Sequence, residues 1–218
     1  MTSVPAAGDP NLIVVGHPMV AHRLGVLRDV RTHSTMFRQL VSEMSSLIAY
    51  EALSDLGMRV VRIDTPVVGG VPVGQVDETV LLVPILRAGL GMVPAIQEVL
   101  PLTEVAHVGL RRDDRTLQPT VYLNRLPVDL SDRRVVVCDP MLATGGSLAE
   151  VCDMVVDAGA TRIVALCLLA SVPGLANFRR RHPSVRVACA AIDPELNGRG
   201  FIVPGLGDAG DRLFGPPD

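Results

Sequence analysis

One stretch of the chain places a carboxylate, two hydroxyls and two glycines between an apolar strand and an amphipathic helix. The apolar run Val135–Cys138 ends at Asp139, and the Thr-Gly-Gly-Ser segment 144–147 follows before a helical spacing begins. Glycines let the backbone approach a ligand, and a helix N-terminus offers unpaired N–H groups and a positive dipole end. With the hydroxyls, these groups suit a phosphate monoester, and Asp139 can accept hydrogen bonds from sugar hydroxyls.

Two plainer interpretations of this stretch remain open. In the first, it is an ordinary strand–turn–helix, with Ser147 as the helix cap and Asp139 as a turn residue. In the second, Gly145–Ala149 approximates the GxSxG elbow of hydrolases. That elbow places its serine on the turn directly after the strand, whereas Ser147 lies eight residues beyond Asp139. The spacing therefore disfavours a hydrolase.

A lone arginine follows another apolar run. Arg87 comes directly after Val83–Leu86 and precedes Gly89 and Gly91. A guanidinium at the end of a buried strand can bind an oxyanion through charge-assisted hydrogen bonds, although an arginine at a sheet edge can also simply extend into solvent. The dinucleotide-binding GxGxxG pattern is broken at its third glycine, and no acid follows about 20 residues later. A dinucleotide fold is therefore disfavoured.

The elements that must position these residues alternate between apolar strands and amphipathic helices. Strands that are apolar throughout favour a parallel sheet covered on both faces, hence one α/β domain over residues 1–218. The tail from Asp193 is rich in glycine and proline and does not resemble another βα unit. We expect strands at Val80–Val83, Val105–Leu110, Arg134–Cys138, Arg162–Leu169 and Val185–Ile192, and helices at Ser34–Leu56, Gly91–Leu100, Ser147–Ala158 and Pro173–Arg181. The first helix is expected to begin at a Ser34 or Thr35 cap and to stop at Gly57.

Composition and charge exclude several classes of function. All 20 basic residues are arginine, so chemistry that needs a lysine amine, including a Schiff base or a Walker A phosphate loop, is excluded. A net charge of −3 gives no reason to expect nucleic-acid binding. The four cysteines form no CxxC pair and the five histidines no metal-binding set, which fits a cytoplasmic protein without a structural metal. No signal peptide or membrane span is expected.

Four segments together resemble the phosphoribosyltransferases. Residues 139–147 resemble the family's phosphoribosyl-diphosphate motif, with Asp139-Pro140 in the form associated with uracil phosphoribosyltransferases. Residues 83–92 resemble the pyrophosphate loop, and the mixed-charge run 109–119 resembles the mobile loop; composition alone would make that run a solvated loop. The turn-rich tail 201–215 resembles the hood that binds uracil. The resemblance extends from His17 to Gly215.

The resemblance implies a fold and a set of site residues. The fold is the phosphoribosyltransferase parallel sheet flanked by helices, with an N-terminal arm and a C-terminal hood at about residues 193–215. Asp139, Arg87 and Arg112 become the candidate catalytic residues, with Arg111 as an alternative to Arg112. The implied 5-phosphoribosyl 1-diphosphate (PRPP) site comprises Arg87, Arg112, Asp139, Pro140, Met141, Leu142, Ala143, Thr144, Gly145, Gly146, Ser147 and Asp208. The implied uracil site comprises Ile202, Gly207, Asp208 and Ala209, with Phe201 standing where many relatives have tyrosine.

The implied reaction joins uracil to PRPP and yields UMP and diphosphate, a step of pyrimidine salvage. Mg²⁺ is the implied cofactor, held mostly by substrate oxygens and partly by Asp208. The resemblance also implies a homodimer or a larger homo-oligomer, and GTP as an effector in some relatives. Two alternatives stay open: a pyrimidine-sensing regulator that binds UMP or RNA with weak catalysis, and a transferase acting on another base such as a purine.

Overall fold

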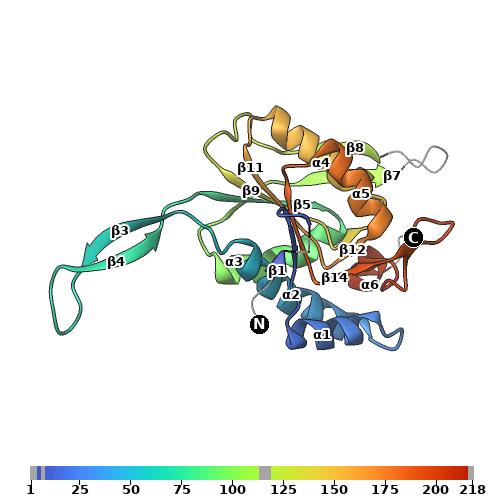
Figure 1. The fold of residues 1–218 in the computed structure, drawn as a ribbon, viewed down its shortest axis with the longest axis horizontal. Helices are drawn as coiled ribbons and strands as arrows, with labels where there is room; N and C mark the ends of the chain where they lie inside the picture. Colours follow the sequence, from blue (N-terminus) through green and yellow to red (C-terminus); the bar gives the residue numbers. More distant parts are fainter. Residues whose placement is uncertain (1–3, 6–7, 113–118, 216–218) are drawn as a thin grey trace.

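A mostly parallel sheet forms the centre of the molecule (Figure 1). The computed structural model describes residues 4–5, 8–112 and 119–215. Strands β2, β13, β11, β9, β5 and β7 lie side by side in this order, all parallel. Strands β1 and β8 pair antiparallel at the two edges, and β6 also pairs with β5. The strands span β1 Val4–Pro5, β2 Leu12–Val14, β5 Val80–Leu86, β6 Glu104–Val105, β7 Val108–Arg112, β8 Pro119–Asn124, β9 Arg134–Cys138, β11 Arg162–Leu166 and β13 Arg186–Cys189.

Helices cover both faces of this sheet, as the uniformly apolar strands predict. Alternate residues of β9 enter different cores: Val136 packs on one face, and Val135 and Val137 on the other. One core includes residues of α1, α2, α3 and α6, whereas the other includes residues of α4 and α5. The helices span α1 Pro18–Arg28, α2 Ser34–Ala52, α3 Val93–Val99, α4 Gly146–Asp157, α5 Val172–Arg181 and α6 Ala209–Phe214, and a 3₁₀ turn, η1, spans Ala88–Met92.

Two expected strands are each divided by a change of sheet. The expected strand Arg162–Leu169 ends as β11 at Leu166, and the chain then enters β12, Leu169–Ser171. The expected strand Val185–Ile192 likewise divides into β13 and β14, Ala191–Asp193. Strands β12 and β14 form a separate parallel sheet with β10, Met141–Leu142. This second sheet lies where the strands leave the central sheet, and it carries the residues that follow Asp139.

Other expected boundaries shift for local reasons. The expected strand Val105–Leu110 is interrupted at Ala106, whose amide donates to the Leu82 carbonyl, and it resumes as β7. Helix α2 ends at Ala52 rather than continuing to Leu56. The expected Ser34 or Thr35 cap is wrong, because the side chain of His33 accepts the hydrogen bond from the Met36 amide. An imidazole nitrogen thus performs the capping that a hydroxyl usually provides.

An antiparallel hairpin forms an arm that the sequence analysis did not predict. Strands β3, Met58–Ile63, and β4, Val71–Val76, pair over their full length, and the arm extends far from the sheet (Figure 1). Several of its apolar side chains are exposed, including Val60 at 77% and Val67 at 89%. Such an exposed apolar surface is characteristic of an interaction surface.

As expected, the C-terminal tail adds no further βα unit. It folds back over the edge of the sheet. It consists of a short hairpin, β15 Glu195–Leu196 and β16 Ile202–Val203, followed by α6. We call residues 193–215 the hood. Among the described residues, no helix has the length and apolar character needed to cross a membrane.

Candidate active site

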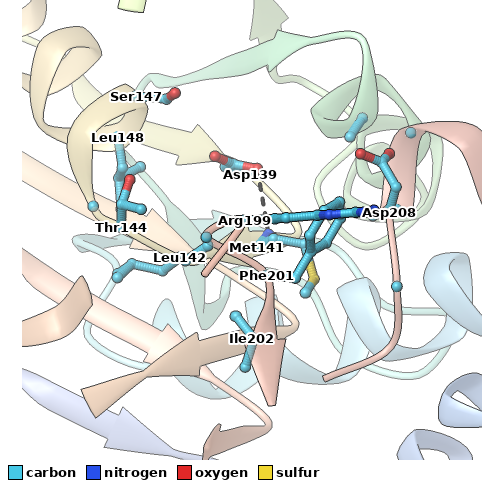
Figure 2. A pocket seen from close by; sticks show the side chains of 17 residues that line it. Asp139, Met141, Leu142, Thr144, Ser147, Leu148, Arg199, Phe201, Ile202 and Asp208 are labelled. Atoms are coloured by element: carbon cyan, nitrogen blue, oxygen red, sulfur yellow. Dashed lines mark hydrogen bonds between the residues drawn. The ribbon is translucent and has the colours of Figure 1, made fainter. Parts of the chain in front are cut away.

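A cavity of about 370 Å³ lies between the loop after β9 and the hood (Figure 2). Asp139 and residues 141–145 line one side of it, and residues 199–202 and 207–210 line the other. A smaller hollow lined by Arg87 and Leu110 shares Asp139, Ser147 and Asp208 with the cavity. The two hollows therefore form one site beyond the carboxyl ends of the parallel strands, where open α/β sheets bind their ligands.

Asp139 stands at the end of the fully buried strand β9 and is itself half-buried. Its Oδ1 accepts a hydrogen bond from the Met141 amide at 3.3 Å, the dashed line in Figure 2. This bond turns the chain from β9 into β10 and leaves the carboxylate on the cavity wall. An anionic acceptor fixed in this way can receive hydrogen bonds from vicinal hydroxyls.

Helix α5 holds the loop at residues 143–145 in place. Ser171 Oγ donates to the Ala143 carbonyl at 2.6 Å, and Asn177 Nδ2 donates to the Thr144 carbonyl at 2.8 Å. A Cβ built on Gly174 would lie 1.9 Å from the Ala143 oxygen, so only glycine permits this approach. The sequence analysis missed all three residues, because they lie in a different βα unit and nothing in their local pattern indicates the contact.

Gly145, and not Ser147, occupies the N-cap position of α4. Its φ is +80°, and a Cβ there would lie 2.6 Å from the Gly174 carbonyl oxygen. The interpretation of Ser147 as an ordinary helix cap is therefore wrong. Ser147 lies in the first turn of α4 and lines both hollows. The loop thus presents two hydroxyls, Thr144 and Ser147, at a helix N-terminus whose N-cap residue has no side chain, and the Thr144 hydroxyl accepts from the Gly146 amide at 3.5 Å.

Arg87 follows β5 directly, where the Leu86–Arg87 peptide bond is cis, and it lines the smaller hollow. Its side chain is 49% exposed and pairs with Asp211 of α6, Nη2 to Oδ1, at 3.3 Å. A Cβ built on Gly89 would lie 2.2 Å from the Cys138 carbonyl oxygen, so this loop packs against the end of β9. The guanidinium is thereby placed beside the carboxylate of the neighbouring strand.

The hood contributes the opposite wall. Ile202 and Ala209 are buried, and Gly207 has a φ of +82°. Asp208 caps α6, its Oδ1 accepting from the Asp211 amide at 2.9 Å, and it lines both hollows. All four residues of the expected uracil site, which are Ile202, Gly207, Asp208 and Ala209, line the cavity.

A buried ion pair anchors the hood to α1. Arg28 binds both carboxylate oxygens of Asp193 at 2.7 Å and also donates to the Gly205 carbonyl at 2.8 Å. Asp193 in turn accepts from the Gly205 amide at 2.9 Å. Burial opposes ionisation of Asp193, but the hydrogen bonds from Arg28 and Gly205 outweigh it and hold the pKa of this carboxyl below its usual value.

Arg212 makes a second anchor, its guanidinium lying 4.3 Å from the centre of the Phe37 ring and donating to the Leu206, Asp29 and Leu27 carbonyls. The hood is thus held rigidly by α1, α2 and the segment between them.

Comparison with known proteins identifies the family to which the chain belongs. The family model for uracil phosphoribosyltransferase matches residues 14–216. The uracil phosphoribosyltransferase of Clostridium perfringens is 47% identical over 92% of this chain and 96% of its own. That of Kineococcus radiotolerans is 49% identical over 94% and 98%. The chain belongs to the uracil phosphoribosyltransferase family.

Solved structures confirm the predicted phosphoribosyltransferase fold. The AQ2163 protein of Aquifex aeolicus superposes with a TM-score of 0.89 at 31% identity and covers 94% of this chain. An adenine phosphoribosyltransferase of Trypanosoma brucei shares the fold, with a TM-score of 0.56 at 14% identity over 88% of this chain. The first similarity also spans 98% of that relative.

Within this member of the family, the residues implied by the phosphoribosyl-diphosphate motif do not all face the cavity. Met141, Leu142, Ala143 and Thr144 line it. Pro140 is buried, and its carbonyl accepts from the Leu168 and Leu169 amides at the start of β12, within the second sheet. Arg112 ends β7, but its side chain and residues 113–118 lie outside the described residues.

The cavity also contains a cation that the sequence analysis did not assign. Arg199 lies in the turn between β15 and β16, and its side chain extends across the cavity toward Asp208 (Figure 2). Asn197 Oδ1 fixes this turn by accepting from the amides of Arg199 and Phe201 at 2.9 and 3.0 Å. Phe201 is 40% exposed on the cavity wall.

Proposed function

We propose that the chain transfers the phosphoribosyl group of PRPP to uracil and forms UMP and diphosphate. In this reaction the bond between ribose C1 and the diphosphate oxygen breaks, a bond from C1 to uracil N1 forms, and N1 loses its proton. One observation carries the proposal: a single cavity is bordered by both the loop after β9 and the uracil-type hood. The reaction needs the two substrates side by side, with C1 facing N1.

The loop after β9 suits the phosphoribosyl group. Thr144 and Ser147 supply hydroxyls, and the start of α4 supplies backbone N–H groups and a positive dipole end for the 5′-phosphate. Asp139 would accept hydrogen bonds from the ribose hydroxyls. As C1 becomes electron-poor in the transition state, a nearby carboxylate also stabilises the positive charge that develops there.

Arg87 suits the leaving diphosphate, since an exposed guanidinium can form bidentate bonds with phosphate oxygens. We assign Arg112 to the same group on the family resemblance alone. Neither residue forms a covalent bond with the substrate. Their contribution is to neutralise the negative charge that builds up on the departing oxygen.

The hood suits uracil because hydrogen bonds anchor its backbone and because Phe201, Ile202 and Ala209 give part of its wall an apolar surface. Uracil needs one acceptor for N3–H and donors for O2 and O4, and backbone groups can provide all three. Cytosine carries an acceptor at N3 and a donor at its exocyclic amine, so the same groups would be left unpaired. Anchoring by Arg28 and Arg212 keeps these backbone groups in register.

Magnesium dependence is part of the proposal. Among the described residues, no group of three or more histidine, cysteine or acidic side chains could hold a metal. Two carboxylates, Asp139 and Asp208, do border the two joined hollows. This donor set fits Mg²⁺ that keeps most of its coordination on water and substrate oxygens, with Asp208 at its edge. Bound there, Mg²⁺ would neutralise diphosphate charge.

We also propose that copies of the chain associate through the arm of β3 and β4. Its exposed valines favour contact with a second copy, because an isolated hairpin of this length is only marginally stable in water. A cytoplasmic location is proposed from the four buried free thiols. GTP is proposed as an effector on the family resemblance alone, and adding it to the assay below tests this.

The deciding experiment measures UMP formation from uracil and PRPP with Mg²⁺. Cytosine, hypoxanthine and metal-free reactions serve as controls. We expect UMP to form from uracil and PRPP in the presence of Mg²⁺. We expect no nucleotide from cytosine or hypoxanthine, and none without the metal. Nucleotide formed from hypoxanthine would indicate a purine enzyme, and no product from folded protein would favour a pyrimidine-sensing regulator, to be tested by UMP and RNA binding.

A further inference from the structure

The hood helix α6 packs directly on the turn that follows β5. A Cβ built on Gly91 would lie 3.0 Å from Leu213 Cδ1, and one on Gly210 would lie 3.9 Å from the Cβ of Ala88. Helix α6 and η1 are therefore in direct contact. The part of the site proposed for uracil and the part proposed for diphosphate therefore share one packed contact.

An ion pair joins the same two elements at the rim of the site. Arg87 Nη2 lies 3.3 Å from Asp211 Oδ1, and the two side chains are 49% and 40% exposed. Asp211 is held in place from behind, since its amide donates to Asp208 Oδ1 at 2.9 Å. An exposed ion pair of this kind is weak, so a ligand with a larger charge can take the arginine from its partner.

Asp211 itself does not line the cavity or the smaller hollow, whereas Arg87 lines the smaller hollow. The carboxylate thus reaches the site only through the guanidinium that it contacts.

We propose that Asp211 is a positioning residue that acts through Arg87, holding the guanidinium when the site is empty and competing with diphosphate for it when the site is filled. This inference rests on the proposed function. Diphosphate is a product of that reaction, so competition by Asp211 weakens its binding and promotes its release. Because Asp211 lies on α6 of the hood, the element proposed to bind the base also influences the release of diphosphate.

The test measures the dissociation constant of diphosphate with Mg²⁺ by calorimetry, in the full chain. Asp211→Asn keeps the size of the side chain and removes its charge, and we expect diphosphate to bind about three- to tenfold more tightly. Asp211→Glu restores the charge and should bind as the native chain does. Asp211→Ser provides a second neutral variant, since serine is well tolerated at the start of a helix.

Two controls separate this competition from a general effect of charge or folding. Asp77→Asn removes the acid of another exposed pair, with Arg59 at 3.5 Å at the base of the arm, and should leave the diphosphate constant unchanged. In an Arg87→Gln background, Asp211→Asn should change the constant by less than about twofold, because the two residues act as one unit. A merely structural role of Asp211 would weaken binding in the neutral variants and lower their melting temperatures.

Unchanged or weaker diphosphate binding by both neutral variants would overturn the inference while leaving the proposed function intact. Equal tightening with and without Arg87 would show direct repulsion and would also overturn it. If the native chain bound no diphosphate and formed no UMP, the proposed function would fail, and the inference with it.

Discussion

At the end of β9 a single carboxylate, Asp139, is followed by a proline and not by a second acid. Pro140 is buried and has no polar side-chain atom, and its carbonyl accepts from the Leu168 and Leu169 amides, so its side chain cannot supply a second contact to the ribose. All the hydrogen bonding to the ribose hydroxyls at this position is therefore expected to fall on Asp139.

We predict that Asp139→Asn lowers kcat/KM for PRPP by at least about tenfold, or roughly 1.4 kcal/mol of transition-state stabilisation. The amide keeps one acceptor oxygen but loses the charge that favours an electron-poor C1. Steady-state kinetics at saturating uracil would measure the change, with the melting temperature as a control for folding. Kinetics equal to those of the native chain would refute the ribose assignment.

A glycine outside the motif is predicted to be as important as those within it. Gly174→Ala would place a methyl group 1.9 Å from the Ala143 carbonyl oxygen. The loop must then move, which we expect to cost about 1–3 kcal/mol of stability and to raise the KM for PRPP. Gly25→Ala is the matched control, because nothing lies within 4 Å of a Cβ there.

Thermal melts and PRPP kinetics of the two variants would test this prediction. Gly25→Ala should be at least as stable as the native chain, since alanine is the better helix former. A Gly174→Ala variant with native stability and a native KM would mean that the loop adjusts freely and that α5 does not fix it.

At the scale of elements, the edge of the sheet opposite the active site carries a network of ion pairs. Arg186 binds both oxygens of Asp55 at 2.8 and 2.9 Å, and Arg134 Nη1 binds Asp55 Oδ1 at 2.7 Å. Glu78 accepts from Arg162 in an ion pair of 2.7 Å. These contacts tie the loop after α2 to the starts of β9, β11 and β13.

The network predicts a loss of stability in acid. The hydrogen bond from Arg186 is the main cause that lowers the pKa of Asp55 to about 2, with a further contribution from Arg134. Because the pKa in the folded state lies below the unfolded value of 3.8, the stabilisation is present above about pH 4 and is lost as the pH falls through about 2. The melting temperature should therefore decline over this range.

Asp55→Asn should show a smaller decline between pH 4 and pH 2, because the titrating group is gone. Asp132→Asn is a suitable control, since the side chain of Asp132 forms no ion pair within the described ranges. If the melting temperatures of the native chain and of Asp55→Asn declined equally between pH 4 and pH 2, the assigned role of this carboxylate would be contradicted.

The local sequence pattern predicted helices and strands well where one or both of their faces are buried. It failed where a boundary depends on contacts with residues distant in the sequence. Strand β9 and helix α5 were found nearly residue for residue, because their apolar periodicity is continuous. The break between β11 and β12 was not predicted, because the chain passes from one sheet to the other without any change in composition. The cap at His33 was not predicted, because histidine is a rare capping residue.

The site followed the same rule. The loops after β5 and β9 were proposed as ligand-binding segments from their own residues, and the hood was proposed from the family resemblance, but the contacts between distant loops were not predicted. Ser171, Gly174 and Asn177 support the loop after β9 from another βα unit, and Arg28 supports the hood from the first helix. Nothing in the spacing of one segment specifies which other segment will pack against it.

At the scale of the whole molecule, the arm is the largest feature that sequence periodicity did not indicate. Its strands alternate poorly, because neither face packs on a core within this chain. We predict that Val60→Glu weakens association of copies of the chain, since Val60 is 77% exposed and a buried charge in an interface is costly.

Light scattering at several protein concentrations would measure this association. Val128→Glu is the matched control, because Val128 is 98% exposed and lies away from the arm. An equal mass for the native chain and both variants, at every concentration, would count against an interface formed by the arm.

The anchoring of the hood by α1 has a consequence for synthesis. A growing chain that has reached β14 already contains the phosphate-binding loop, Arg87 and both sheets, but lacks every residue proposed to contact the base. By then Arg28 has its carboxylate partner Asp193, but the Gly205 carbonyl and Arg212, which complete the anchoring, have not yet been made. Activity is therefore expected only after the hood has been synthesised, because a chain that ends at β14 lacks the residues proposed to contact uracil.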